Sequence, residues 1–303
     1  MSSHGNGYKV LVIHRKTSYQ QMTSGEYRHL LRAMEAQKDP IIDRMLLAHD
    51  THTRSMAQIQ DALEQRGINA TWRHDFSGLI PDNFDLVITV GGDGTILHAS
   101  HAIGKVPVLS INSSPETSTG YFASGDASEF PEIIDKVLDM DMEVQKLYRM
   151  EVTVNGEVVN SRVLNDVLFS NNCPASTTRY ELRVNKQREH QISSGIWIST
   201  ASGSTAALKA AGGEPMPTGA TELQYLVREP CPGGGRDHLR LPSLTNGLIS
   251  KEDSLAIRSK SSSATLFIDG PHVVVPVNFG DIITVSGGAP PIFLYGKLDK
   301  NKT

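Results

Sequence analysis

The sequence predicts an α/β domain followed by a β-rich, sandwich-like domain. Up to residue 112, short apolar runs alternate with helical stretches, as in a sheet whose parallel strands are joined by helices. After residue 125, short β-type runs bounded by Gly, Asn, Asp or Pro follow closely on one another. The length of 303 residues is enough for two domains, each with its own hydrophobic core.

The first part of the chain opens on a buried strand at Tyr8–Ile13, an apolar and β-branched run. Two helical stretches follow, near Tyr27–Gln37 and Ile41–Gln65, and Gly67 ends the second because glycine suits the residue that closes a helix. Further strands are expected over 68–73, 84–90 and 107–111, and a helix over 95–103. The order strand, glycine turn, helix, strand makes a βαβ unit.

The second part begins near residue 125 and is dominated by short β-type runs. One helix is expected over 129–138. Strands are expected over 151–154, 162–169, 180–184, 195–200, 254–258, 265–268, 273–277 and 281–285, a density typical of an antiparallel sandwich. The segment Pro230–Gly247 is rich in Gly and Pro and predicts a long mobile surface loop.

Composition argues against two classes of partner. The formal net charge is -4 at pH 7, so no basic surface for nucleic acid is expected. No apolar run reaches the roughly 18 residues that a membrane span needs, and the N-terminus shows no signal core. Cys173 and Cys231 form no metal motif and are expected as reduced thiols, as in a cytoplasmic protein. Together with the charge and the lack of an apolar run, this predicts a cytoplasmic protein with no membrane or nucleic-acid partner.

The most informative motif is Gly91-Gly92-Asp93-Gly94-Thr95, directly after a buried strand. Glycines let the backbone turn tightly and expose its N–H groups, and the helix that follows adds the positive end of its dipole. Together these features predict a phosphate-binding loop. Asp93 fits such a loop as a general base for an attacking hydroxyl, or as a carboxylate facing a magnesium ion carried by a triphosphate.

An ordinary glycine turn with an exposed aspartate is the alternative for this segment. Its spacing matches neither the lysine-containing phosphate loop nor the dinucleotide-binding glycine pattern. On the helix that follows, His98 and His101 lack a third ligand at zinc spacing, so we expect no metal held by the protein alone there.

A second motif is made of small residues, several with hydroxyl groups. Ser202-Gly203-Ser204-Thr205-Ala206 follows a strand and leads into a short helix. The hydroxyls of Ser202, Ser204 and Thr205 can cap that helix or donate to an amide or phosphate of a ligand. An ordinary capped helix explains the same residues.

The third motif is the pair Asn165-Asp166, inside the apolar run 162–169. Two adjacent polar residues in a strand point to opposite faces, so one of them faces inward and needs a partner. A carboxylate that accepts two ribose hydroxyls would supply such a partnership, and a bulge or a strand end is the alternative.

Taken in this order, the three motifs resemble those of the NAD kinase family, and most closely its plant NADH kinase branch. The similarity runs from about Asp85 to Val285. The glycine motif alone also occurs in lipid kinases of the diacylglycerol and sphingosine type, whereas the three motifs in order are specific. Two shorter matches lie outside them: Gly120-Tyr121-Phe122 and Asp269-Gly270.

The resemblance implies an N-terminal Rossmann-like α/β domain, a C-terminal β-sandwich-like domain and a substrate cleft between them. It places residues 1–125, with a return of 289–303, in the first domain and residues 126–288 in the second. It also implies ATP with Mg²⁺ as phosphoryl donor, NAD+ or NADH as acceptor, and a homodimer or homotetramer.

The roles of single residues are carried over from the family in the same way. Asp93 would be the base for the 2′-hydroxyl of the adenosine ribose. Asn165 and Asp166 would hold the dinucleotide, Asp166 through ribose hydroxyls. Four further residues would line the base pockets: Tyr121 and Phe122 beside the adenine, and Thr205 and Ala206 beside the nicotinamide or adenine.

Two departures from the family pattern bear on the acceptor. Most members have Gly-Asp-Gly where this chain has Ser193-Ser194-Gly195, and most have Tyr where it has Ala207. Both changes resemble the plant NADH kinase branch. Losing a carboxylate near a cationic nicotinamide ring weakens binding of the oxidised form, so Ser194 predicts a shift toward NADH.

Two other functions stay open at this level. A lipid kinase shares the glycine motif, but it needs a membrane-facing apolar or basic segment, and none is evident. A dinucleotide-binding sensor without catalysis would easily have lost Asp93, so the presence of Asp93 favours an enzyme.

Overall fold

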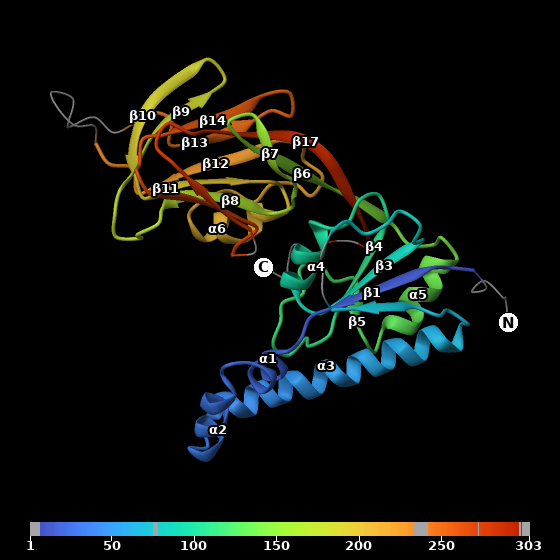
Figure 1. Cartoon of the computed structure of the whole chain (residues 1–303). Helices are drawn as coiled ribbons and strands as arrows, with labels where there is room; N and C mark the ends of the chain where they lie inside the picture. Colours follow the sequence, from blue (N-terminus) through green and yellow to red (C-terminus); the bar gives the residue numbers. More distant parts are fainter. Residues whose placement is uncertain (1–6, 75–77, 233–241, 272, 297, 299–303) are drawn as a thin grey trace. The chain divides into compact units, whose positions relative to one another are not determined.

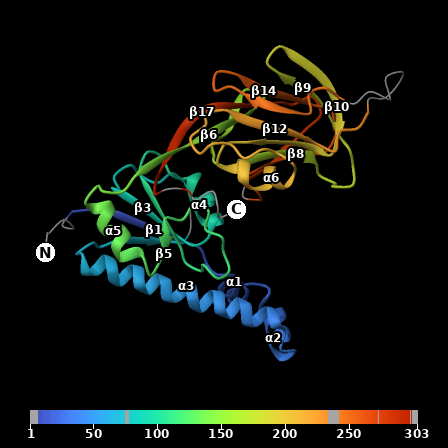
Figure 2. The same ribbon diagram turned by 180° about the vertical axis from the view of Figure 1, so that it is seen from behind.

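The structure is a computed structural model of the chain and describes residues 7–74, 78–232, 242–271, 273–296 and 298. The chain divides into two compact units (Figures 1 and 2). The N-terminal unit contains Met1–Gln145 and Phe293–Thr303, and the C-terminal unit contains Lys146–Ile292. The C-terminal unit is therefore one continuous stretch inserted between two segments of the N-terminal unit.

A parallel sheet forms the centre of the N-terminal unit. Its strands pair in the order β4-β3-β1-β2, with β5 beside β4. Their bounds are β1 Val10–His14, β2 Thr71–Arg73, β3 Leu86–Val90, β4 Val108–Asn112 and β5 Gly125–Asp126. β3 and β4 are buried along their whole length, which is why they are apolar without alternation. On the side of β4 that faces away from β3, Leu294 pairs in parallel with Val108.

The helices of this unit are α1 Ser18–Ser24, α2 Arg28–Ala36, α3 Pro40–Gln65, α4 Asp93–Ser100 and α5 Phe130–Leu138, and α1 and α2 pack at the N-terminal end of α3 (Figure 1). α3 and α5 lie along one face of the sheet, and α4 lies along the other (Figures 1 and 2). α1 was not predicted, although Thr17 and Gln20 form a capping box at its start. α3 begins at Pro40 after Asp39, whose side chain accepts from the N–H of Ile41.

The division between the units falls after Gln145, whereas the expected boundary lay near residue 125. The reason is α5. Its apolar residues Phe130, Ile133, Ile134 and Val137 follow helical spacing and pack in the same cluster as the strands of the N-terminal unit. At the other end, the return begins at 293 rather than 289.

The C-terminal unit is built from two antiparallel layers. One is the six-stranded sheet β13-β12-β11-β8-β15-β16, and the other contains β10-β9-β14-β17 together with the β6–β7 hairpin. Phe169 and Ile198 of the first layer pack in one core cluster with Leu182 and Ile257 of the second. This arrangement confirms the predicted β-sandwich following an α/β domain (Figure 1).

The strands of this unit have the following bounds. The six-stranded sheet contains β8 Asp166–Asn171, β11 Gly195–Ser199, β12 Leu223–Arg228, β13 Asn246–Ile249, β15 Ala264–Ile268 and β16 Val273–Val277. The other layer contains β6 Val144–Val154, β7 Glu157–Val163, β9 Thr178–Val184, β10 Gln187–Ser193, β14 Ser254–Ser259 and β17 Ile282–Tyr295. β6 begins, and β17 ends, in the N-terminal unit.

In the described part of the C-terminal unit, four strands escaped prediction: β7, β10, β12 and β13. β10, for example, reads QREHQIS and has too few apolar residues to reveal a strand. The single strand expected over 162–169 was wrong, because β7 ends at Val163 and β8 begins at Asp166. In the predicted loop at 230–247, residues 233–241 lie outside the described residues. The end of that loop is held, because the carboxylate of Glu189 accepts from the N–H groups of Ser243 and Leu244.

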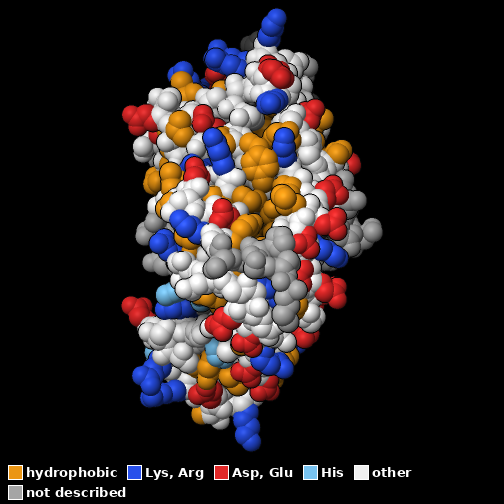
Figure 3. All heavy atoms as spheres, turned by 90° about the vertical axis from the view of Figure 1, so that its right-hand side faces the viewer, with side chains coloured by type: hydrophobic (Ala, Val, Ile, Leu, Met, Phe, Trp, Pro, Cys, Tyr) orange, Lys and Arg blue, Asp and Glu red, His pale blue; other side chains and the backbone are white. Residues whose placement is uncertain are grey.

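The surface carries mixed charge. On the face shown in Figure 3, acidic and basic side chains are interspersed, and hydrophobic side chains gather in a strip over the C-terminal unit. Among the described residues, no helix is both long and apolar enough to cross a membrane.

Candidate active site

The glycine motif joins β3 to α4, at the carboxyl end of the parallel sheet. A side chain at either of its first two positions would contact a neighbouring hydroxyl too closely. A Cβ on Gly91 would fall on Oγ1 of Thr95, and a Cβ on Gly92 would lie 2.5 Å from Oγ of Ser118. Gly92 is the N-cap of α4 and makes no side-chain cap hydrogen bond. The first turn of α4 therefore presents backbone N–H groups and the positive end of the helix dipole, which suit a phosphate.

Asp93 is the first residue of α4, and both of its carboxylate oxygens are engaged. One accepts a hydrogen bond of 3.0 Å from the N–H of Tyr121, and the other accepts one of 3.0 Å from the N–H of Phe122. Each oxygen keeps a further lone pair, so Asp93 can still accept a proton or a hydrogen bond from a hydroxyl. The structure thus joins the side chain of Asp93 to the backbone of Tyr121 and Phe122, a contact that the sequence did not predict.

The rings of Tyr121 and Phe122 are buried in the N-terminal unit. They are 8% and 2% exposed and pack edge to face, with ring centroids 5.1 Å apart. Gly120 precedes them at φ +62°, and a Cβ there would lie 2.5 Å from Nδ2 of Asn112. The segment is therefore fixed by close packing on one side and by Asp93 on the other.

Asn165 and Asp166 lie at the start of β8 in the C-terminal unit, and both are buried. They do not sit inside one strand, because the chain turns here around the carboxylate of Asp269. That carboxylate accepts from the N–H groups of Asn165 at 2.7 Å and of Asp166 at 3.1 Å. The pair therefore lies where β8 begins, and not in the interior of a strand.

The side chains of the pair have unusual surroundings. Oδ1 of Asn165 is buried and has no hydrogen-bond partner among the described residues. Burial and the nearby charge of Asp269 raise the pKa of Asp166 to about 7. Buried amide oxygens without a described donor and buried carboxyls with a raised pKa are enriched at functional sites, so this pair is a candidate for one.

The hydroxyl motif lies directly against this pair. A Cβ on Gly203 would fall on the carbonyl oxygen of Asn165. Oγ1 of Thr200 donates to the carbonyl oxygen of Leu164 at 2.5 Å, and Oγ of Ser199 donates to that of Asn165 at 3.0 Å. The second and third motifs are thus one structure within the C-terminal unit.

Within the hydroxyl motif, the predicted residues differ in exposure. Ser202 and Ser204 are buried, Thr205 is half-buried and Ala206 is exposed. The hydroxyl of Ser204 donates to the carbonyl oxygen of Ala201 at 2.7 Å and accepts from the N–H of Met216 at 2.8 Å. Ser204 therefore stabilises the turn Gly203–Thr205. The helix that follows, α6 Ala207–Ala210, has a single turn.

Ser194 lies between β10 and β11, half-buried. Its N–H donates to the carbonyl oxygen of Arg228 at 3.0 Å. Gly195 follows at φ +123°, and a Cβ there would fall on the carbonyl oxygen of Phe169. The side chain of Arg228 forms a long ion pair of 3.9 Å with Glu229. The residue whose carbonyl oxygen accepts from Ser194 is therefore an arginine.

Two residues that matter here were not assigned roles from the sequence. Arg15 follows β1, and its Nη1 lies 3.6 Å from the position of a Cβ on Gly94, so its guanidinium reaches the glycine loop. A basic residue directly after the first parallel strand was the available signal. Asp269 had been noticed only as a short match, because nothing in the sequence reveals a contact across more than a hundred residues.

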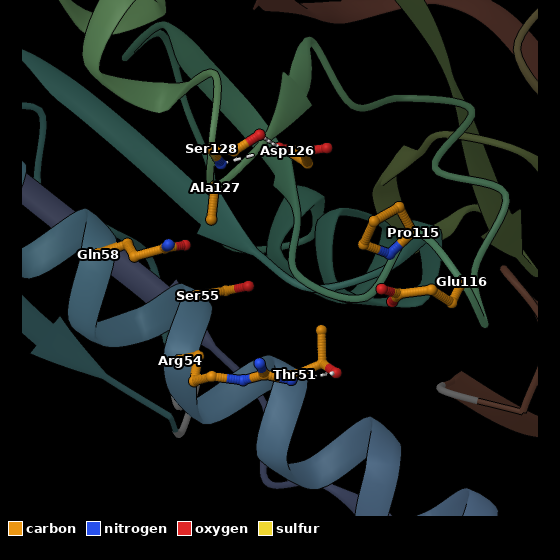
Figure 4. A pocket seen from close by; sticks show the side chains of 9 residues that line it. All are labelled: Thr51, Arg54, Ser55, Gln58, Pro115, Glu116, Asp126, Ala127 and Ser128. Carbon is orange, nitrogen blue, oxygen red and sulfur yellow. Dashed lines mark hydrogen bonds between the residues drawn. The ribbon is translucent and has the colours of Figure 1, made fainter.

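The N-terminal unit also contains two pockets lined by other residues. One, of about 250 Å³, is lined by Thr51, Arg54, Ser55 and Gln58 of α3 and by two loops (Figure 4). In one of those loops, Asp126 accepts from the N–H and the hydroxyl of Ser128. The other, of about 600 Å³, lies between α1 and α3. None of the predicted site residues lines either pocket.

Comparisons with known proteins agree with these motifs. A family model, the ATP-NAD kinase N-terminal domain, matches residues 10–142. A probable NADH kinase from Oryza sativa subsp. japonica is 34% identical over 263 residues, covering 79% of each chain. The NADH kinase of Arabidopsis thaliana is 34% identical over 279 residues, covering 80% of this chain and 83% of the relative.

Two solved structures share the fold. An NAD kinase from Archaeoglobus fulgidus in complex with ATP superposes with a TM-score of 0.62 at 19% identity, covering 96% of this chain and 94% of that one. Yeast NADH kinase complexed with NADH superposes with a TM-score of 0.72 at 18% identity, covering 98% and 85%.

Proposed function

The chain belongs to the NAD kinase family and is a phosphotransferase that converts NAD(H) to NADP(H), and we propose that ATP is its donor and NADH its preferred acceptor. The main support for this proposal is the 34% identity to a probable NADH kinase and an NADH kinase of plants over about four fifths of the chain. Ser194 supports it too, because it stands where most members of the family have an aspartate. Assembly into a homodimer or homotetramer is part of the same proposal.

Phosphoryl transfer is assigned to the glycine loop and Asp93. The 2′-oxygen of the adenosine ribose attacks the γ-phosphorus, the bond to the bridging oxygen breaks, and ADP leaves. Asp93 accepts the proton of the attacking hydroxyl on a lone pair that its two backbone donors leave open. The N–H groups of the first turn of α4 and the guanidinium of Arg15 bind the phosphates.

A magnesium ion, when bound with the triphosphate, neutralises part of the phosphate charge. Among the described residues, no group of three His, Cys, Asp or Glu side chains is placed to hold a metal ion. A donor set that supplies one carboxylate, from Asp93, fits an ion held mainly by phosphate oxygens and water. Asp93 would then be a single carboxylate near the ion, and not one of several protein ligands.

The acceptor is assigned to the C-terminal unit. Asp166 accepts hydrogen bonds from ribose hydroxyls, and the buried Oδ1 of Asn165 accepts one from the dinucleotide, which would satisfy its missing donor. At Ser194 the chain lacks the family's carboxylate. A positively charged nicotinamide ring is therefore bound less favourably than the neutral reduced ring.

The first experiment is a direct product assay. The purified protein is incubated with MgATP and either NAD+ or NADH, and NADP+ and NADPH are quantified by chromatography. A higher kcat/KM with NADH supports the proposal, and a higher value with NAD+ contradicts the preference while leaving the kinase intact. Dinucleotide binding without product from folded protein would favour a non-catalytic sensor.

A further inference from the structure

Asp269 is a buried carboxylate that gathers three consecutive backbone donors. It is 3% exposed and follows β15 in a left-handed conformation at φ 49°. Its Oδ2 accepts from the N–H of Leu164 at 2.9 Å. Its Oδ1 accepts from the N–H groups of Asn165 and Asp166, and its own N–H donates to the carbonyl oxygen of Asp166.

This arrangement fixes the main chain that carries the acceptor-binding pair. Three neighbouring N–H groups that converge on one anion form a concave nest, which holds a single backbone conformation. The direction of the Asn165 and Asp166 side chains follows from that conformation. Asp269 thus acts on the pair from a position 103 residues away from Asp166 in sequence.

Asp269 also affects Asp166 electrostatically. Asp269 accepts from three backbone N–H groups and lies near the buried side chain of Arg149 on β6. Arg162 on β7 is a second cation beside Arg149. Asp166 is the other buried carboxyl in this region, and burial together with the charge of Asp269 raises its pKa to about 7.

We propose that Asp269 is the positioning residue of the dinucleotide site and that it makes the affinity for the dinucleotide rise with pH across neutrality. An ionised Asp166 accepts two ribose hydroxyls, whereas a protonated one accepts fewer. Binding below neutral pH therefore releases the proton of Asp166. The inference rests on the proposed role of Asp166 in holding the ribose.

The test begins with a readout that needs no dinucleotide. Aspartate carboxyl carbons are labelled with ¹³C, and the Asp166 resonance is assigned as the one missing from Asp166→Asn. In the native protein this resonance should titrate near pH 7, and in Asp269→Asn its midpoint should fall by about one pH unit or more. In Asp269→Asn, the amides of residues 164–166 should exchange with deuterium roughly tenfold faster or more.

The second readout is NADH binding, followed by fluorescence from pH 5.5 to 8.5. Native affinity should rise several-fold through neutrality, and in Asp269→Asn the rise should move to lower pH while affinity falls. A purely structural role would lower affinity equally at every pH. Asp281→Asn is the matched control, because Asp281 also caps a turn of this unit, accepting from the N–H of Asn278 at 2.8 Å.

The outcomes separate this inference from the proposed function. An Asp166 titration unchanged in Asp269→Asn overturns the inference, whatever the binding data show. The expected carboxyl shift with no NADH binding at any pH supports the electrostatic part and refutes NADH as ligand. If Asp269→Asn fails to fold, Asp166→Asn decides, because it should make NADH affinity flat across neutral pH, and a retained rise contradicts the proposal.

Discussion

The carboxylate of Asp93 and the backbone N–H of Tyr121 are joined by a hydrogen bond of 3.0 Å that spans 28 residues of sequence. The other carboxylate oxygen of Asp93 accepts a hydrogen bond from the N–H of Phe122. The residue expected to take part in phosphoryl transfer therefore also anchors the Gly120–Phe122 segment. Substitutions at Asp93 change two properties at once, and activity and stability must be measured together.

Replacing Asp93 should separate these two properties. In Asp93→Asn one oxygen remains as an acceptor, so we expect a loss of stability of about 1 kcal/mol and a fall in kcat of roughly a hundredfold or more. Asp93→Ala removes both acceptors and should lose about twice as much stability. Thermal unfolding and steady-state kinetics measure the two effects. Asp85→Asn is the control, since Asp85 accepts from the N–H of Lys9 outside the loop. Near-native kcat in a folded Asp93→Asn would refute the base.

Close packing at the glycine loop predicts a compensating pair. Gly92→Ala should destabilise the protein by about 1–3 kcal/mol, because its Cβ would lie 2.5 Å from Oγ of Ser118. Adding Ser118→Ala removes that oxygen and leaves the Cβ of Ser118 at 3.4 Å. The double variant should recover most of the lost stability in chemical denaturation. Simple additivity of the two single changes would show that the contact is not the cause.

Arg15 should matter for the donor and not for the acceptor. Arg15→Gln removes the guanidinium that reaches Gly94, so we expect the KM for ATP to rise roughly tenfold with little change in the KM for NADH. Lys16→Gln, the next residue and also exposed, is the matched control. Equal effects of the two substitutions would indicate general loss of positive charge near the sheet.

Asp166 should make stability depend on pH. Its pKa is raised to about 7 in the folded protein from the 3.8 of an unperturbed aspartate, so between these values the folded state binds a proton that the unfolded state lacks. Stability therefore falls as pH rises through this window, by roughly 4 kcal/mol at most. Asp166→Asn should remove that fall, so the free energy of unfolding of the variant should exceed the native value most clearly at pH 8. A difference independent of pH would contradict the raised pKa.

The choice of acceptor should respond to Ser194. Ser194→Asp restores a carboxylate, and we expect the ratio of kcat/KM for NAD+ to that for NADH to rise about tenfold. Ser176→Asp, at an exposed position of the same unit, controls for the added charge. An unchanged ratio in Ser194→Asp would show that this position does not set the preference.

Much of the fold was predictable because its strands are apolar and its helices periodic. β3, β4 and α5 were found for that reason, and the sandwich followed from the density of short strands. β10 was missed because only one of its residues is apolar, so its pairing with β9 depends on tertiary context. The domain boundary was placed early because α5 belongs to the preceding core, a fact of packing that sequence spacing does not contain.

The sequence proposes candidate site residues, but it does not predict their contacts. Gly91, Gly92 and Asp93 stand out because only glycine fits such a loop and a carboxylate in it is unusual. The partners of Asp93 and Asp166 are distant backbone groups and another carboxylate, and these contacts have no local signature. Ser204 looked available to a ligand, but its hydroxyl is used within the fold.

The insertion of the C-terminal unit between two segments of the N-terminal unit sets an order of completion during synthesis. Residues 146–292 leave the ribosome as one continuous stretch and contain all of their own core. The N-terminal unit gains its last partners only afterwards, when Leu294 pairs with Val108 and the N–H of Gly296 reaches the carbonyl oxygen of Glu143. The C-terminal unit is therefore fully synthesised before the N-terminal unit has all of its residues. The unit whose synthesis begins first is thus the last to complete its fold.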